Sequence, residues 1–139
     1  MTFLMPFYER LLSAGHEARC HRARIRIETR TSTTVVRVRG EVDASSSHFF
    51  IATVRRCLAT PTPLIVDLTE VQFLGAGVIT MLLNIYHDPQ VEDGLAILTA
   101  DGHLRRAMEV IDRYDPHDTS SFRRLQLVHS VTGGDSVLD

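Results

Sequence analysis

The sequence contains no lysine, so all fifteen of its basic Lys and Arg positions are arginine. No folding requirement explains this choice, and we interpret it as the codon bias of a GC-rich genome. Without lysine the chain cannot form the Gly-x-x-x-x-Gly-Lys loop that holds nucleotide phosphates. It also lacks a basic excess, since its formal net charge is −2. We therefore expect no direct contact with nucleic acid, because binding phosphates requires a surplus of basic side chains.

Cysteines and long apolar runs are also scarce. Cys20 and Cys57 are too few for the disulfide framework of a small secreted protein, which favours a reducing cytosol. Glu9 and Arg10 interrupt the N-terminal segment where a signal peptide has a continuous apolar region. No apolar run approaches the roughly 20 residues that cross a membrane. We expect a soluble, cytoplasmic protein with no membrane association.

The chain contains enough hydrophobic residues for the core of one domain, and its most apolar segments lie near the middle of the sequence. Its 139 residues and 44% hydrophobic content are typical of a globular domain with one core. Leu64–Leu68 is an apolar run typical of a strand buried on both faces, and 78–85 is apolar enough for a buried helix. Leu74–Gly77 forms a glycine-containing corner between them. Such corners present backbone N–H groups and small side chains to a partner.

The remaining periodicity predicts an α/β protein with a mixed sheet and helices packed mainly on one face. The predicted order is β-β-α-β-α-β-α-β. We expect strands at 24–28, 35–39, 64–68, 95–99 and 124–128, and helices at 47–59, at about 78–85 and from a cap at Asp101 to about 111.

The two ends of the chain differ from this pattern. Residues 1–22 predict a separate amphipathic extension, a short helix ending near Gly15 that covers its own domain or joins two copies in a homodimer. A membrane-surface anchor is the alternative, but the polar face carries few cations. The main domain is expected at 23–131, and 132–139 is expected to be a flexible tail.

The sequence offers no good catalytic or metal site. No serine lies in a Gly-x-Ser-x-Gly elbow. Asp67 interrupts the buried strand and is expected to be held by the backbone or a neighbouring side chain, and Cys57 is expected to be a packed thiol. His16, Cys20 and His21 lie close together, but their spacing matches no zinc pattern. We predict a protein that is not an enzyme and has no cofactor and no metal.

Three motifs together resemble the STAS domain, the fold of bacterial anti-sigma factor antagonists. Val38–Asp43 resembles the family's hydrophobic-x-Gly-Glu-hydrophobic-Asp motif, and Ile65–Phe73 resembles its Val-Asp-Leu-Ser-x-Val-x-Phe strand. The third motif is the Leu74–Gly77 corner. The resemblance covers about residues 24–131 and implies a regulator of transcription. Such a regulator binds an anti-sigma factor that is also an ATP-binding serine kinase.

In that family the corner has the sequence Asp-Ser-Ser-Gly, and the partner kinase phosphorylates the first serine to release the antagonist. Here Leu74 stands at the aspartate position, Gly75 at the phosphoacceptor position and Ala76 at the second serine, and only Gly77 agrees. Glycine has no hydroxyl group, so phosphorylation at this position is impossible. The resemblance therefore implies partner switching with a lost off-switch, because a phosphate would add nearly two negative charges.

Two hypotheses follow. In the first, the domain binds an anti-sigma factor and cannot be switched off at the corner. Its contact residues would be Asp43, Ser45, Ser46, Leu74, Gly75, Ala76, Gly77 and Val78. In the second, the fold serves as a scaffold or self-associating module, or senses a small anionic ligand at the Gly75–Gly77 helix N-terminus. Phosphorylation of a serine at 45–47 or of Thr80 is an alternative to their capping and packing roles.

Overall fold

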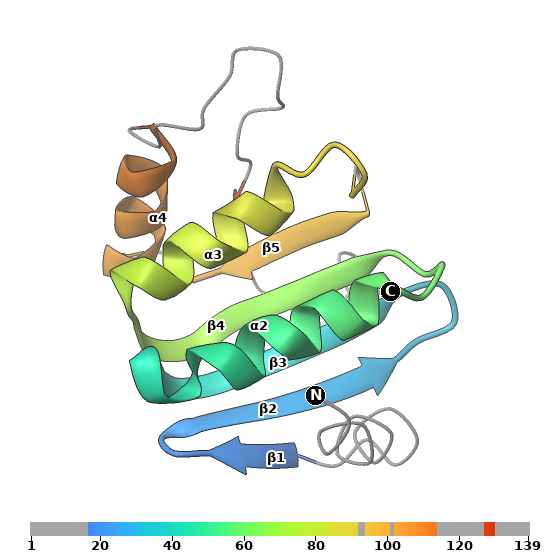
Figure 1. Ribbon diagram of the computed structural model, residues 1–139, viewed down its shortest axis with the longest axis horizontal. Coiled ribbons are helices and arrows are strands. Elements are labelled where there is room, and N and C mark those ends of the chain that lie inside the picture. The colour runs from blue at the N-terminus through green and yellow to red at the C-terminus, as the bar shows by residue number, and fades with distance from the viewer. Residues whose placement is uncertain (1–16, 92–93, 101, 114–126, 130–139) are drawn as a thin grey trace.

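The computed structural model describes residues 17–91, 94–100, 102–113 and 127–129. These residues form a six-stranded sheet in the order β1-β2-β3-β4-β5-β6 (Figure 1). The first three strands pair antiparallel, and β3 to β6 pair parallel. The elements are β1 (Glu17–Cys20), β2 (Ala23–Thr29), β3 (Thr34–Val42), α2 (Ala44–Leu58), β4 (Leu64–Leu74), α3 (Ala76–Tyr86), β5 (Leu95–Thr99), α4 (His103–Arg113) and β6 (Leu127–His129).

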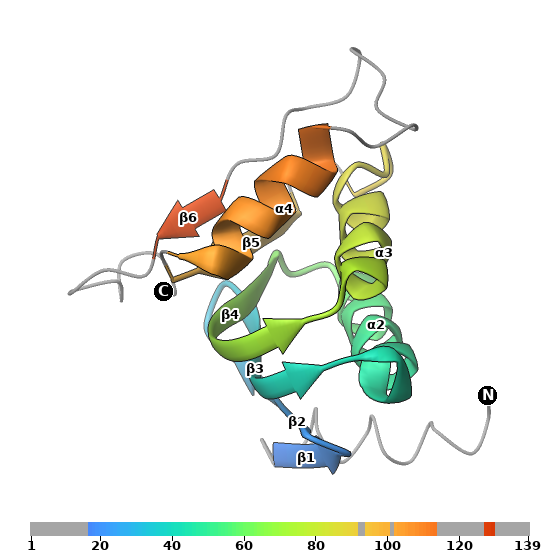
Figure 2. The ribbon, with the colours of Figure 1, turned by 90° about the vertical axis from the view of Figure 1, so that its left-hand side faces the viewer.

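The predicted α/β order is confirmed from β2 to β6, as is the mixed sheet. The described helices lie on one face of the sheet, where their apolar sides form one core with the strands (Figure 2). Fully buried side chains come from every layer of this core, which contains Ile25, Phe50, Leu68, Leu82, Ile97 and Met108. Burying each such side chain is worth about 1.5–3 kcal/mol before the entropy cost of ordering it. No described helix has both the length and the apolar character needed to span a membrane.

One strand was not predicted. Glu17–Cys20 forms β1, which pairs antiparallel with β2, although the sequence pattern placed these residues in the N-terminal extension. Ala18 is buried in the core and Cys20 packs against it, but four residues are too few for alternation to be recognised. His21, with φ of 57°, turns the chain between the two strands. The predicted amphipathic helix and its dimer contact lie within or next to residues 1–16, outside the described part, as does the predicted tail.

The helix α2 begins earlier than predicted, at Ala44 rather than Ser47. Asp43 is its N-cap and accepts a hydrogen bond from the Ser45 backbone N–H at 2.9 Å. The Ser46 hydroxyl accepts a bond from the Asp43 N–H at 3.2 Å and completes a capping box. The three serines therefore belong to the first turn and not to a loop. The prediction was wrong because it assigned the cap to a hydroxyl when a carboxylate stood just before.

The central strand β4 is buried at residues 64–68, as predicted, and is longer than expected. Residues 64–68 are all buried, and β4 then continues as far as Leu74. Its pairing with β3 shifts register on both sides of Gly40, where φ is +88°. A Cβ at Gly40 would lie 2.2 Å from the Arg22 carbonyl oxygen, so only glycine fits this close approach.

The C-terminal part agrees with the sequence where it is described. Met108 is buried in α4, and Leu104, Ala107 and Ile111 pack against the core. The predicted last strand appears as β6, although residues 124–126 and the predicted cap Asp101 lie outside the described residues.

Candidate partner-binding corner

Two helix N-termini meet at one end of the sheet, where β3 leads into α2 and β4 leads into α3 (Figure 1). The strands pair in register at Val42 and Leu74, and the Gly75 N–H donates a hydrogen bond to the Val42 carbonyl at 2.9 Å. A Cβ on Gly75 would lie 3.9 Å from the Asp43 Cα. The end of the Val38–Asp43 motif and the Leu74–Gly77 corner therefore lie side by side.

The α2 side of this corner carries a negative charge. The Asp43 carboxylate accepts hydrogen bonds from the Ser45 hydroxyl and the Ser45 N–H, at 2.5 and 2.9 Å. These bonds, the side-chain bond first, hold the pKa of Asp43 below its ordinary value. The ionised carboxylate also complements the positive end of the α2 dipole.

The α3 side of the corner is small and uncharged. Gly75 is the N-cap of α3, with φ −62° and ψ 149°, and no side chain caps this helix. Ala76 and Gly77 are exposed in its first turn. A Cβ on Gly75 would meet only ordinary van der Waals contacts, and a Cβ on Gly77 would meet none. The corner therefore has room for larger side chains at both glycines.

The structure divides the predicted contact residues into two groups. Asp43, Ser45, Gly75, Ala76 and Gly77 are exposed or half-buried and can touch a partner. The other predicted contact residues are buried beneath them: Ser46, Leu74 and Val78. In this conformation these three side chains support the corner from within the core.

One residue of this surface was missed by the sequence analysis. Phe73, the last residue before Leu74 in β4, is 52% exposed. The signal was present in the strand alternation, because a buried Leu74 places Phe73 on the opposite face. An exposed aromatic side chain beside small residues is typical of a protein-contact anchor. Phe73 therefore exposes an apolar side chain at the end of β4, next to the corner in sequence.

Two predicted structural roles are confirmed. Asp67 is buried and bound by Arg37 at 2.5 Å and by the Thr69 hydroxyl and N–H at 2.7 and 2.9 Å, so it is not a free base. Cys57 is fully buried, and burial raises the pKa of its thiol to about 11.

Other candidates have structural roles or lie outside the description. His87 Nε2 lies 2.5 Å from Asp112 Oδ1 and joins the end of α3 to α4. Thr80 is exposed rather than packed, and its hydroxyl donates to the Ala76 carbonyl at 3.1 Å. Among the described residues no group of three His, Cys, Asp or Glu side chains could hold a metal ion, and His16 is not described.

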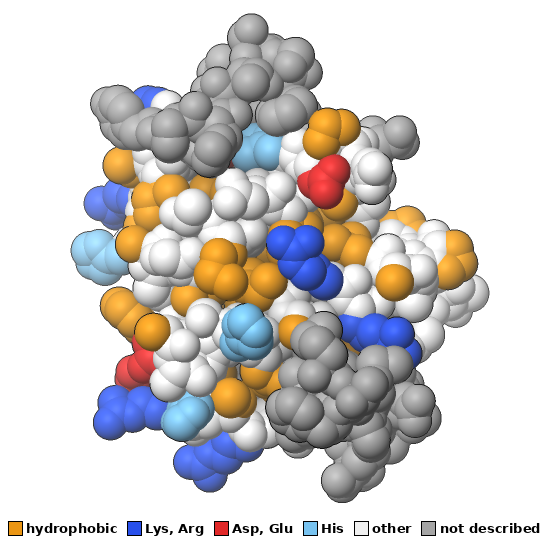
Figure 3. All heavy atoms as spheres, in the orientation of Figure 1, with side chains coloured by type: hydrophobic (Ala, Val, Ile, Leu, Met, Phe, Trp, Pro, Cys, Tyr) orange, Lys and Arg blue, Asp and Glu red, His pale blue; other side chains and the backbone are white. Residues whose placement is uncertain are grey.

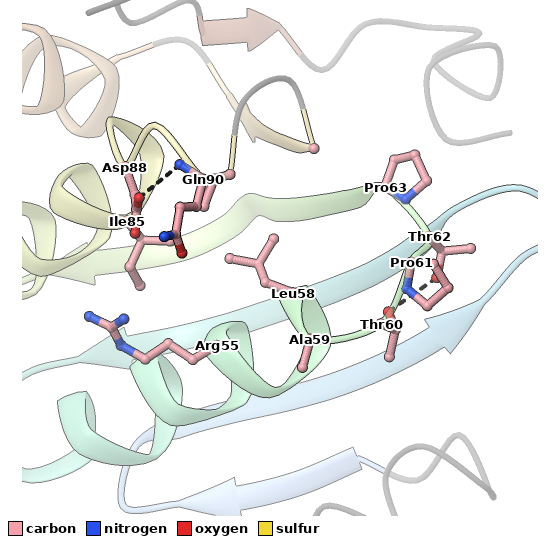
Figure 4. Close-up of a pocket in the computed structure, with 12 residues that line it drawn as sticks. Arg55, Leu58, Ala59, Thr60, Pro61, Thr62, Pro63, Ile85, Asp88 and Gln90 are labelled. Carbon is pink, nitrogen blue, oxygen red and sulfur yellow. Dashed lines mark hydrogen bonds between the residues drawn. The ribbon is translucent and has the colours of Figure 1, made fainter.

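A hollow of about 450 Å³ lies at the far end of the helices from the corner, between the C-terminal ends of α2 and α3 (Figure 4). Its lining is mainly apolar and threonine side chains, with Arg55 on one side and Asp88 on the other. Asp88 already accepts the Gln90 N–H at 2.9 Å. The space-filling view of this face shows hydrophobic side chains among scattered Arg and His side chains (Figure 3). Among its described lining residues there is no set of groups suited to catalysis.

Comparison with known proteins agrees with this architecture. The structure of an anti-sigma factor antagonist from Mycobacterium paratuberculosis matches with a TM-score of 0.64 at 22% identity, covering 84% of this chain and 92% of the other. The unphosphorylated anti-sigma factor antagonist SpoIIAA matches with a TM-score of 0.58 at 15% identity, covering 81% and 92%. At these identities the likeness shows a shared fold. No curated protein matches the sequence.

The model of one protein family, the STAS domain, matches residues 24–112, from β2 to the end of α4. This match covers most of the chain and includes both motifs that meet at the corner. The chain therefore belongs to the STAS domain family.

Proposed function

We propose that this protein is a non-catalytic, cytoplasmic regulator that binds an anti-sigma factor of the ATP-binding serine kinase type through the corner surface. The corner surface consists of Asp43, Ser45, Phe73 and Gly75–Gly77. We further propose that the kinase cannot release it by phosphorylation at Gly75. The observation that carries the proposal is the placement of Gly75. It caps α3 beside Asp43 with space around it, and by the resemblance of Leu74–Gly77 to the family's Asp-Ser-Ser-Gly it stands at the phosphoacceptor position.

The electrostatics of the corner support a single, permanently binding state. A phosphate at this helix N-terminus would bring nearly two negative charges next to the ionised Asp43 carboxylate. Because Gly75 cannot carry a phosphate, Asp43 is the charged side chain of the corner and its charge does not change. Phe73 and Ala76 offer apolar surface that a partner can cover without desolvating a second charge. Binding through this surface would respond to the amount of the protein and not to kinase activity.

The test uses the full chain and each purified anti-sigma factor of this type from the same organism. Binding is measured by titration calorimetry before and after incubation with Mg-ATP, and intact mass reports phosphate uptake. We expect tight binding to one of them, an unchanged Kd after ATP and no added mass. Phosphate on the chain together with loss of the complex would overturn the proposal, as would failure of every such partner to bind.

Matched variants localise the contact. Phe73→Ala is expected to weaken binding by at least about tenfold, because exposed aromatic anchors dominate interface energies. Val110→Ala is the control, since Val110 on α4 is the other large exposed hydrophobic residue of the described chain. Equal losses from both variants would contradict a contact at the corner. Asp43→Asn keeps a capping side chain and removes the charge, so it separates the charge of Asp43 from its helix-capping role.

A further inference from the structure

The sheet face opposite the helices carries arginines in a row across three strands. Ile25 and Ile27 of β2 point into the core, so Arg24 and Arg26 point to the other face, which no described helix covers (Figure 2). Arg24 lies opposite Arg19 on one side and opposite Arg39 on the other. Like charges directly opposite one another on neighbouring strands are unfavourable. An anion bound to this row would therefore relieve the repulsion between the arginines.

Other arginines on the same face form ion pairs with acidic side chains. Arg37 lies 2.5 Å from Asp67 and 2.8 Å from Glu28, which also lies 3.7 Å from Arg26. Within the first row, Arg39 is paired with Glu17 at 3.1 Å. These pairs use acidic side chains from β1, β2 and β4.

Two guanidinium groups of this face have no anionic partner among the described residues. Arg19 and Arg24 are both exposed, and neither makes an ion pair or a side-chain hydrogen bond with any residue of the described chain. They stand directly opposite each other across the β1–β2 pair. Because the net charge of the whole chain is −2, this local excess of positive charge is not a general property of its surface.

The unpaired arginines line a groove. A hollow of about 420 Å³ is lined by Arg19, Arg22, Arg24, Arg39, Gly40, Glu41, Glu70 and Gln72. A second hollow of about 220 Å³ shares Arg39 and Glu70 with it and adds Glu17, Arg26 and Arg37. Through the shared residues the two hollows form one arginine groove that crosses β1 to β4. Its lining includes Glu41 and Gln72. Glu41 lies opposite Phe73 in the β3–β4 pair, and Gln72 precedes Phe73 in the sequence.

We propose that the arginine groove binds an extended, acidic segment of a partner protein. Alternate side chains of a strand stand about 6.8 Å apart, so Arg24 and Arg26, which stays exposed although Glu28 lies 3.7 Å away, match the spacing of alternate carboxylates in an extended peptide. Guanidinium groups bind carboxylates through two parallel hydrogen bonds, which gives geometric specificity. Glu41 and Glu70 in the lining oppose a uniformly charged polymer such as nucleic acid and favour a ligand with spaced charges. This inference goes beyond the corner contact and does not depend on it.

The test is fluorescence anisotropy of the full chain with a labelled peptide that alternates glutamate and threonine. We expect saturable binding that weakens with added salt, because the contacts are exposed ion pairs. Arg19→Gln with Arg24→Gln is expected to weaken it by about tenfold or more. Thermal unfolding of this double variant should not be destabilised, since the two side chains have no anionic partner among the described residues.

The control is Arg55→Gln with Arg106→Gln, which removes two exposed arginines from α2 and α4. The control should bind the peptide as the wild type does, within about twofold. Equal weakening by both double variants would show attraction by net charge alone and would overturn the proposal. So would an absence of saturable binding, or tighter binding of a single-stranded oligonucleotide of equal charge. These outcomes leave the corner proposal untouched, because neither Phe73 nor the Gly75 corner is altered.

Discussion

Arg37 Nη1 lies 2.5 Å from Asp67 Oδ2, across the β3–β4 pair at a point where the two residues are opposite in register. The second oxygen of the Asp67 carboxylate accepts from both the backbone and the hydroxyl of Thr69. A buried carboxylate with both oxygens bound is a structural element of the sheet and not a free base.

Replacing Asp67 by asparagine should therefore destabilise the fold. We expect Asp67→Asn to lower the free energy of unfolding by about 2 kcal/mol, because the Arg37 charge loses its buried anion. Urea unfolding at neutral pH measures the loss. The control is Glu70→Gln on the same strand, an exposed residue whose change should stay within about 0.5 kcal/mol. Equal stability of the two variants would contradict the structural role of Asp67.

Stability should also depend on pH through Glu28. Burial raises the pKa of Glu28, but hydrogen bonds and charges from Arg37 and Arg30 outweigh it and hold the pKa below the ordinary 4.5. A carboxyl group whose pKa is lowered on folding stabilises the fold above its ordinary pKa and loses that contribution as the pH falls through the folded value. The stability difference between wild type and Glu28→Gln should therefore shrink in urea titrations taken from pH 7 to pH 3. A difference that grows on acidification would refute this assignment.

Two glycines, Gly40 in β3 and Gly77 in α3, should respond oppositely to alanine. At Gly40 the backbone has φ +88° and an added Cβ would lie 2.2 Å from the Arg22 carbonyl oxygen, so Gly40→Ala should cost about 3 kcal/mol. At Gly77 an added Cβ meets nothing within 4 Å, and Gly77→Ala should stabilise α3 by about 0.5–1 kcal/mol. Thermal unfolding of both variants gives the comparison, and a destabilised Gly77→Ala would count against the described start of α3.

The two thiols should differ in reactivity. Cys57 is fully buried with a pKa of about 11, so it should not react with Ellman's reagent in the folded protein. Cys20 is half-buried, and burial and the Asp43 charge raise its pKa, so it should react, but more slowly than a free thiol. In the native Cys20→Ser variant, Ellman's reagent should produce no increase in absorbance until urea unfolds the protein. Rapid labelling of that variant in its native state would show that the core around Cys57 opens.

Restoring a phosphoacceptor should require two changes at the corner. Gly75→Ser alone fits the available space and should stabilise α3 by a few tenths of a kcal/mol, because serine caps slightly better than glycine. We expect it to take up no phosphate from the cognate kinase, whereas Leu74→Asp with Gly75→Ser should take up phosphate and release the partner. Circular dichroism must first show that the double variant folds, since Leu74 is buried. Phosphate on the single variant, detected by intact mass, would contradict the role assigned to Leu74.

The sequence by itself determined the elements whose burial repeats along the chain. The strands β2, β4 and β5 and the helix α4 all appeared close to where they were predicted. The motifs Val38–Asp43 and Ile65–Phe73 and the Leu74–Gly77 corner also indicated the family from the sequence alone. These features are local, because the period of burial and the chemistry of a motif depend on residues close together in the sequence.

Only the tertiary structure decided which distant residues meet. It joined Gly75 to Val42, added β1 to the sheet, buried Leu74 while exposing Phe73, and aligned Arg19, Arg24 and Arg39 in one row. Each of these depends on strand register, and a shift of one residue would turn every side chain of a strand to the opposite face. Register is set by pairing between segments far apart in the chain, so local sequence patterns do not contain it.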